Sequence, residues 1–313
     1  MTTSPRLLTL MIPCYNQPGL LASCLQSVKE QTFQDLDILL IDDNSSESYA
    51  GVLDQFQCLH PKYLRNPKNL GAIPNMLFAL NGACDSKYKM VFHEDDLMHP
   101  QMLELEVRAM EQEPDVVFAG SSMQIFEGTP TPATRAKPFN GRYERYDQVS
   151  DLVRNFMRGA PFAFGSVLYR SSAVEKVAAD MTRFSAVADR PLLCELAKKG
   201  SSLFLPDPLL FYRSHGPSDS RGSQLTEKHL IELCRYYRSC LPERWDPADE
   251  ALFYSFATNN LLDSYPRLNA GTRPNFLDYV TACRKAGVFR ARSLDFRGAK
   301  AAIKCLWSRV HPR

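Results

Sequence analysis

The chain has 313 residues, of which 44% are hydrophobic and 23% are charged, and its formal net charge is +2. This is the composition of a globular protein with one large domain, or with a domain and an extension. No apolar run reaches the ~18 residues of a membrane span, and the apolar stretch 7–13 is too short for a secretory signal. We therefore expect a cytoplasmic protein, and the near-neutral charge gives no indication of a nucleic-acid partner.

The first 120 residues alternate between strand-like and helix-like patterns. Continuous apolar runs predict buried strands at 6–13, 36–42, 88–93 and 115–120, and a short third strand is expected at 62–66. Helical periodicity and capping residues predict helices at 18–32, 44–57 and 100–112, and a loop followed by a helix within 69–83. Such alternation predicts an α/β fold with right-handed crossovers and a mostly parallel sheet flanked by helices.

The pattern is less regular after residue 126. A loop is expected over 127–146, a strand over 162–170, and helices over 147–159, 171–180 and 188–200. Two short extended segments are expected within 202–215, because Pro206 and Pro208 interrupt the run. Helical patterns follow from about residue 224. We therefore expect one domain over 1–223 and a helical C-terminal extension over 224–313.

The nine cysteines are scattered along the chain, odd in number and never spaced as CxxC. Reduced and mostly buried thiols fit this distribution better than a disulfide framework or a cysteine metal site. The chain also lacks the glycine-rich motifs of dinucleotide-binding and P-loop proteins after its first strand, and it lacks HExxH.

Polar residues follow three of the predicted strands, and the carboxyl ends of parallel strands are where ligands of such sheets bind. Pro13–Asn16 follow the first strand, Asp42 and Asp43 end the second, and Glu94–Asp96 follow the fourth. Adjacent carboxylates are tolerable where a hard cation such as Mg²⁺ or Mn²⁺ joins them to a substrate phosphate. The alternative for both acidic pairs is that they cap the helices that follow.

The stretch "LTLMIPCYNQPGLLASCLQSVKEQTFQDLDILLIDDNSSE" resembles the opening of family 2 glycosyltransferases, and "ADRPLLCELAKKGSSLFLPDPLLFYRSHG" resembles their closing segment. The resemblance covers about 7–126 and 161–220, and it implies the Rossmann-like GT-A fold. It also implies a nucleotide-sugar site. By this resemblance the nucleoside would lie between Tyr15 and Asp43, and the residues expected near the nucleotide are Pro13, Asn16, Asp42, Asn69 and Gly71.

The metal motif of that family, usually written DxD, falls on residues 93–96. Its last two acids match, so Asp95 would face the ribose or the metal and Asp96 would ligate the metal, while His93 departs from the pattern. The cofactor implied is Mn²⁺ or Mg²⁺. In the closing segment, His215 would ligate the metal or donate to the pyrophosphate, and Arg213 and Arg221 would neutralise phosphates. A solvated loop histidine is the alternative for His215.

Inverting members of the family use an acid at the start of a late helix as general base, and Asp189 occupies that position. The base must deprotonate the acceptor hydroxyl on the face opposite the departing nucleotide. A helix cap is the alternative for Asp189, given Pro191 in the first turn. Gly165 and Ser166 resemble the floor under the donor sugar, with plain strand packing as the alternative.

The resemblance implies transfer of a sugar, with a UDP-sugar favoured, to a hydroxyl of a glycan or lipid-linked acceptor in bacterial surface polysaccharide assembly. A non-catalytic nucleotide-sugar or carbohydrate-binding module on the same fold is one alternative. A nucleotidyltransferase is another, although "PCYNQPG" is not the glycine- and lysine-rich loop that it would need. Segment 284–313 carries nine Lys and Arg residues against Asp295 alone. It predicts peripheral contact with the inner face of the cytoplasmic membrane, or else a basic helix packed on its own domain.

Overall fold

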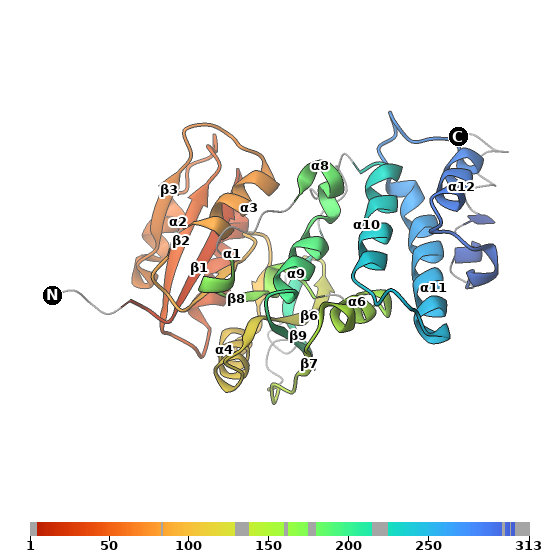
Figure 1. Ribbon diagram of the computed structural model, residues 1–313. Coiled ribbons are helices and arrows are strands. Elements are labelled where there is room, and N and C mark those ends of the chain that lie inside the picture. Colours follow the sequence, from red (N-terminus) through yellow and green to blue (C-terminus); the bar gives the residue numbers. More distant parts are fainter. Residues whose placement is uncertain are drawn as a thin grey trace. The chain divides into compact units, whose positions relative to one another are not determined.

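The computed structural model describes residues 5–82, 84–128, 138–159, 162–174, 180–214, 225–295, 298–300 and 302–303 (Figure 1). The chain forms two compact units, each of which collects separate stretches of sequence. Unit 1 comprises Met1–Asp147, Pro161–Ala178 and Leu196–Gly216. Unit 2 comprises Gln148–Ala160, Ala179–Glu195 and Pro217–Arg313. Unit 2 thus includes two stretches that precede the expected domain boundary at 223/224. That boundary stays a prediction.

Unit 1 is built on one mixed, mostly parallel sheet with the strand order β3-β2-β1-β4-β8-β6-β9-β5, and β7 pairs with β9. The strands are β1 (Leu8–Cys14), β2 (Leu36–Asp42), β3 (Lys62–Arg65), β4 (Tyr88–Val91), β5 (Leu97–Met98), β6 (Val116–Phe126), β7 (Glu144–Tyr146), β8 (Leu168–Arg170) and β9 (Ser201–Arg213). The pairs β1–β2, β1–β4, β2–β3 and β6–β9 are parallel. The expected α/β fold class is therefore confirmed.

Central strands β1 and β4 are buried along nearly their whole length, as continuous apolar runs require when both faces of a sheet are covered. The helices of this unit are α1 (Pro18–Lys29), α2 (Ala50–Gln55), α3 (Ala72–Asn81), α4 (Met102–Gln112) and α7 (Ser171–Val174). Helix α1 begins at Pro18, whose fixed φ suits a first turn, and it buries Leu21, Leu25 and Val28 at helical spacing.

Several elements differ from the sequence expectation. The two segments expected within 202–215 form one continuous strand, β9. The pairing register between β6 and β9 shifts near Pro206 and Pro208, so the strand continues past both prolines. The expected strand at 162–170 is shorter: Phe164–Ser166 form a 3₁₀ turn and only Leu168–Arg170 pair. Pairing with β9 also draws β5 and β7 into the sheet, and neither was expected.

Unit 2 is helical, with α6 (Val149–Met157), α8 (Met181–Phe184), α10 (Glu227–Ser239), α11 (Pro247–Ser264) and α12 (Phe276–Lys285), while α9 (Asp189–Ala197) begins in it. Helices α10 and α11 lie side by side (Figure 1). The caps are sequence-encoded: Asp246 accepts a hydrogen bond from the Asp249 amide, and Asn275 caps α12 in the same manner.

Across the described part of the chain, no helix has both the length and the apolar character needed to cross a membrane. Within the same residues, no disulfide joins the cysteines, and six of them are buried. The expectation of mostly buried thiols therefore agrees with the structure of the described residues.

Candidate active site

Strand β4 delivers a metal-ligand-like cluster to the carboxyl end of the sheet. One ligand atom each from His93, Asp95 and Asp96 lies within 4.8 Å of the others. The preceding strand is wholly buried and pairs with β1, which fixes where the cluster begins. Sequence reasoning predicted the two acids. His93 departs from the family motif in the sequence, although a histidine two residues before an aspartate is itself a ligand signal.

Asp96 is the most buried member of this cluster, at 1% exposure. Its Oδ1 accepts a hydrogen bond from the Arg213 amide at 2.9 Å. Its Oδ2 accepts no hydrogen bond from the described residues and lies 3.5 Å from His93 Nδ1. Burial raises the pKa of Asp96, and the interaction with His93 acts in the opposite direction. A buried carboxylate oxygen without a hydrogen bond beside two further ligand groups is suited to a divalent cation.

Gly165 borders the cluster, and its lack of a side chain keeps the space in front of the acids open. A Cβ at this position would lie 3.6 Å from His93 Nδ1 and 3.7 Å from Asp96 Oδ2. Ser166, by contrast, is fully buried, and its hydroxyl bonds the carbonyls of Ser121 and Ala163. The two residues therefore have different roles. Gly165 borders the ligand cluster, and Ser166 stabilises the adjacent turn through its hydrogen bonds.

Glu94 lies outside the ligand cluster and joins two other loops. Its Oε1 accepts a hydrogen bond from the Tyr15 amide at 2.6 Å, and its Oε2 accepts one from the Tyr49 hydroxyl at 3.0 Å. Burial raises the pKa of Glu94 to about 7. The carboxyl group therefore fixes the segment after β1, a role that the sequence did not reveal.

The segment after β1 presents Tyr15 to solvent on an ordered backbone. Tyr15 is 46% exposed, although its amide donates a hydrogen bond to Glu94. The next residue, Asn16, has φ 55° and accepts hydrogen bonds from the Ser46 and Glu47 amides. Pro13 precedes both within β1. A planar ring fixed at its base and free at its tip can stack on a flat ligand.

Asp42 and Asp43 are both buried and do not cap the helix that follows, since α2 begins only at Ala50. Asp42 accepts hydrogen bonds from the Ser45 amide at 2.9 Å and from the Tyr63 hydroxyl at 2.6 Å. Both acids therefore act within the protein on the loops that border this edge of the sheet.

Asp43 organises the loop before α3. Its carboxylate accepts hydrogen bonds from the amides of Leu70 and Gly71, each at 2.8 Å, and its carbonyl accepts one from Asn69 Nδ2. Asn66 Nδ2 is a further donor, at 2.9 Å. Gly71 has φ 88°, which favours glycine at this turn. Asn69 and Gly71 thus lie beside Asp43 in the loop before α3, and their expected place near a nucleotide stays a prediction.

Arg213, at the end of β9, forms hydrogen bonds with the acidic segment Glu94–Asp96. Its Nε donates to the Asp95 carbonyl at 2.8 Å, and one terminal nitrogen donates to the Gly128 carbonyl at 2.7 Å. The guanidinium also lies 4.7 Å from the centre of the Phe126 ring. His215 and Arg221 lie outside the described residues.

Asp189 is the first residue of α9, as its sequence position predicted, and it is half-buried. It belongs to unit 2, whereas the ligand cluster belongs to unit 1. Electrostatic interaction with Tyr237, and less strongly with Asp189, raises the pKa of neighbouring Arg190. The catalytic role of Asp189 stays a prediction.

The structure defines a mostly parallel α/β domain with an acidic cluster at the carboxyl end of its strands, and comparison with known proteins gives the family. The model of Glycosyl transferase family 2 matches residues 9–177, more than half of the chain, and the chain belongs to this family. Glycosyltransferase GlyG of Streptococcus pneumoniae serotype 4 is 27% identical over 115 residues, which make up 36% of this chain and 38% of GlyG. The chain thus matches well under half of that relative's length.

Two solved structures share the fold across nearly the whole chain. TarS 1–349 of S. aureus in complex with UDP has a TM-score of 0.61 at 12% identity, covering 98% of this chain and 92% of that one. The mannosyltransferase PcManGT of Pyrobaculum calidifontis, in complex with GDP-Man and Mn²⁺, has a TM-score of 0.55 at 14% identity, covering 99% and 82%. These likenesses confirm the GT-A-like architecture.

Proposed function

We propose that this protein is a glycosyltransferase that moves a sugar from a nucleotide diphosphate sugar to an acceptor hydroxyl, with inversion at the anomeric carbon. The observation that carries the proposal is the cluster of His93, Asp95 and Asp96 at the ligand edge of a family 2 fold. The buried Asp96 Oδ2, which accepts no hydrogen bond from the described residues, has the character of a metal ligand.

His93, Asp95 and Asp96 would hold Mn²⁺ or Mg²⁺, and His215 is a further candidate from the sequence. When bound, such a cation neutralises the charge that develops on a departing diphosphate. The chain's own contribution is the geometry: Arg213 holds the acidic segment through the Asp96 carboxylate and the Asp95 carbonyl, and Gly165 leaves room in front of it. Mn²⁺ in the PcManGT complex supports this part of the proposal.

The nucleoside would bind where Tyr15 is exposed, with the backbone beneath it fixed by Glu94 and Asn16. Asp42 and Asp43 shape this edge through the loops they hold, and Asn69 and Gly71 border it. A UDP-sugar is the favoured donor, and the UDP and UDP-GlcNAc complexes of TarS support that choice. Pro13 would support the same surface from β1, and Arg213 would add positive charge near the phosphates.

Asp189 would act as the general base that takes the proton from the acceptor hydroxyl. A base contributes to this step only if it lies on the face of the sugar opposite the leaving diphosphate. A glycan or a lipid-linked saccharide in bacterial surface polysaccharide assembly is the proposed acceptor. The protein would then work at the inner face of the cytoplasmic membrane.

The test is a panel of UDP-, GDP- and dTDP-sugars incubated with the full chain in Mn²⁺ or Mg²⁺, scored for release of the nucleoside diphosphate. We expect slow donor hydrolysis for one donor, dependent on metal and faster once a suitable acceptor is added. Binding of a donor with no turnover under any acceptor would instead identify a non-catalytic binding module. Absence of both binding and turnover would overturn the proposal.

A further inference from the structure

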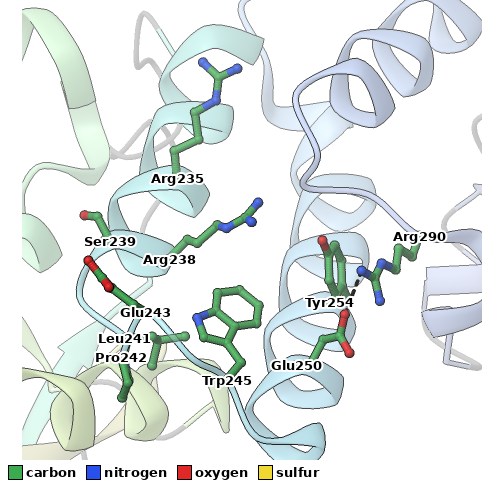
Figure 2. A pocket seen from close by; sticks show the side chains of 10 residues that line it. All are labelled: Arg235, Arg238, Ser239, Leu241, Pro242, Glu243, Trp245, Glu250, Tyr254 and Arg290. Carbon is green, nitrogen blue, oxygen red and sulfur yellow. Dashed lines mark ion pairs between the residues drawn. The ribbon is translucent and has the colours of Figure 1, made fainter.

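The helical unit contains a pocket of about 660 Å³ that plays no part in the proposed chemistry (Figure 2). All of its lining residues belong to unit 2. They come from the end of α10, the connection to α11, the first turns of α11 and the segment after α12. The charged and aromatic lining includes Arg235, Arg238, Trp245, Glu250, Tyr254 and Arg290.

Three arginines line this pocket, and they differ in whether a carboxylate pairs with them. Arg290 pairs with Glu250 at 2.7 Å, and Arg235 pairs with Glu232 at 2.9 Å. Arg238 has no carboxylate within ion-pair distance among the residues that the structure describes; its guanidinium lies 5.2 Å from the centre of the Trp245 ring. Figure 2 shows Arg238 extending across the pocket above Trp245. One cation in the pocket is therefore available to an anion.

Aromatic rings supply the other part of the lining. Trp245 is half-buried and packs against Phe253 in an edge-to-face contact, with the ring centres 5.0 Å apart. Tyr254 follows on α11 and stacks under Arg290 at 3.4 Å. The Trp245 ring is thus held in one orientation while part of it faces the pocket (Figure 2). A fixed, partly exposed indole offers an apolar platform beside the cation.

This combination matches a particular ligand chemistry. A guanidinium forms paired hydrogen bonds with a phosphate or carboxylate, and ligand sites combine such a group with aromatic walls. A hexose has a flat face of C–H groups that packs on an indole ring. We propose that this pocket binds an anionic saccharide, in which a sugar ring lies on Trp245 and its phosphate or carboxylate pairs with Arg238.

The arrangement argues against a nonspecific polyanion site. Glu243 and Glu250 line the same pocket, and two of the three arginines already have acidic partners. A long polyanion would meet these carboxylates, whereas a single anionic group on Arg238 would not. The binding test is independent of the proposed transfer reaction, because none of these residues belongs to the ligand cluster of unit 1.

The chain has two tryptophans, so Trp307→Phe leaves Trp245 as the fluorescent reporter of the pocket. The full chain with this substitution is titrated separately with glucose 1-phosphate, glucuronate, inorganic phosphate and glucose. We expect a saturable change in fluorescence with the two charged sugars at concentrations up to about ten millimolar. Glucose and inorganic phosphate should each bind at least tenfold more weakly, because each supplies half of the interaction.

Arg238→Gln should weaken binding of glucose 1-phosphate at least tenfold while the melting temperature stays within a few degrees. Arg244→Gln is the matched control, since it removes the same charge close in sequence from a residue that does not line the pocket, and its binding should equal that of the parent. No saturable change with either charged sugar would overturn the proposal. So would equal binding of inorganic phosphate and glucose 1-phosphate, or unchanged binding in Arg238→Gln.

Discussion

At the scale of single residues, the acidic run Glu94–Asp96 divides into different tasks. Asp95 and Asp96 join His93 in the ligand cluster, while the Glu94 carboxylate accepts hydrogen bonds from the Tyr15 amide and the Tyr49 hydroxyl. The sequence could predict the pair of aspartates, since their spacing after a buried strand is visible. It could not assign Glu94, because its partners lie 45 and 79 residues earlier in the chain.

The ligand cluster gives the first prediction. Asp96→Asn and His93→Ala should each weaken Mn²⁺ binding by about tenfold or more, because each loses one ligand of a small set, a cost of about 1.4 kcal/mol or more. Isothermal titration of Mn²⁺ into the full chain measures this directly. Asp54→Asn, on an exposed part of α2, is the matched control and should leave the titration unchanged. Unaltered Mn²⁺ affinity in both cluster variants would remove the metal assignment.

Asp189 gives the second prediction, because its two proposed roles respond differently to one substitution. Asparagine caps a helix about as well as aspartate does, but it cannot accept a proton as a general base. Asp189→Asn should therefore lower turnover by roughly 10²–10⁴-fold while donor binding and melting temperature stay close to the parent. Turnover within a few-fold of the parent would leave Asp189 with the capping role alone.

At the scale of elements, helix α4 carries a buried acid, Glu106. Nothing in the sequence of the helix separates it from the other glutamates of α4. Glu106 is fully buried, and neither of its oxygens accepts a well-oriented hydrogen bond from the described residues. Burial raises the pKa of Glu106 well above its usual value, with the nearby Ser121 hydroxyl acting in the opposite direction. The folded protein therefore keeps this carboxyl protonated where the unfolded chain would release the proton.

The third prediction follows from the sign of this shift. The contribution of Glu106 to the free energy of unfolding is fully present below about pH 4.5, its unfolded value, and is lost as the pH rises. Relative to Glu106→Gln, the parent should lose about 1.4 kcal/mol for each unit by which the pKa is raised. Urea unfolding between pH 4 and 8 measures the difference. Glu104→Gln, at a partly exposed position of α4, should keep the slope of the parent, and a parent slope equal to that of Glu106→Gln would contradict the prediction.

Strand β9 contains two prolines and is longer than its local sequence predicts. Pro206 and Pro208 argue for two short segments, because proline removes a backbone donor from a sheet. In the structure, the shifts in register between β6 and β9 fall opposite these residues, so the strand continues past them. The apolar runs of β1, β2 and β4 were predictable because they carry their own signal, whereas the two-residue β5 exists only through its pairing with β9.

At the scale of the whole molecule, distant segments are joined by contacts that no local pattern records. In unit 2, Arg154 of α6 forms a fork with Asp249 of α11 across 95 residues of sequence, with two nitrogen–oxygen distances of 2.8 Å. Arg154 lowers the pKa of the Asp249 carboxyl. Paired bonds of this kind hold a segment from the middle of the chain against the C-terminal helices.

The fourth prediction concerns this fork. Arg154→Gln should lower the free energy of unfolding by about 1–3 kcal/mol, because the buried carboxylate of Asp249 loses its charged partner. Arg235→Gln removes a more exposed pair within α10 and should change stability by about 0.5 kcal/mol or less. Urea denaturation of both variants provides the measurement, and equal losses for the two would contradict the special role of the fork.

The fifth prediction concerns the basic end of the chain. Described parts of 284–303 pack on their own unit: Val288 is fully buried, and Leu294 and Ala302 pack against Leu262 and Phe276. Arg284, Lys285, Arg292 and Lys300 are exposed all the same. Segment 304–313, outside the described residues, carries Lys304, Arg309, Arg313 and Trp307 and is the part that the experiment removes. Deleting 304–313 should weaken binding to anionic vesicles by about 1 kcal/mol per basic residue. Neutral vesicles are the control, and unchanged sedimentation with anionic vesicles would exclude a contact through 304–313.

The sequence alone determined the alternation of strands and helices, the strand ends at which polar residues gather, and the family. These signals are local, since apolar periodicity and short motifs act over a few residues. Only the tertiary structure decided that His93 joins the ligand cluster, that Gly165 faces it, and that Glu94, Asp42 and Asp43 hold loops. The partners of Glu94, Asp43 and Gly165 lie tens of residues away in the sequence, whereas those of His93 lie two and three residues away. The energy of a buried polar group depends on the partner that folding places beside it.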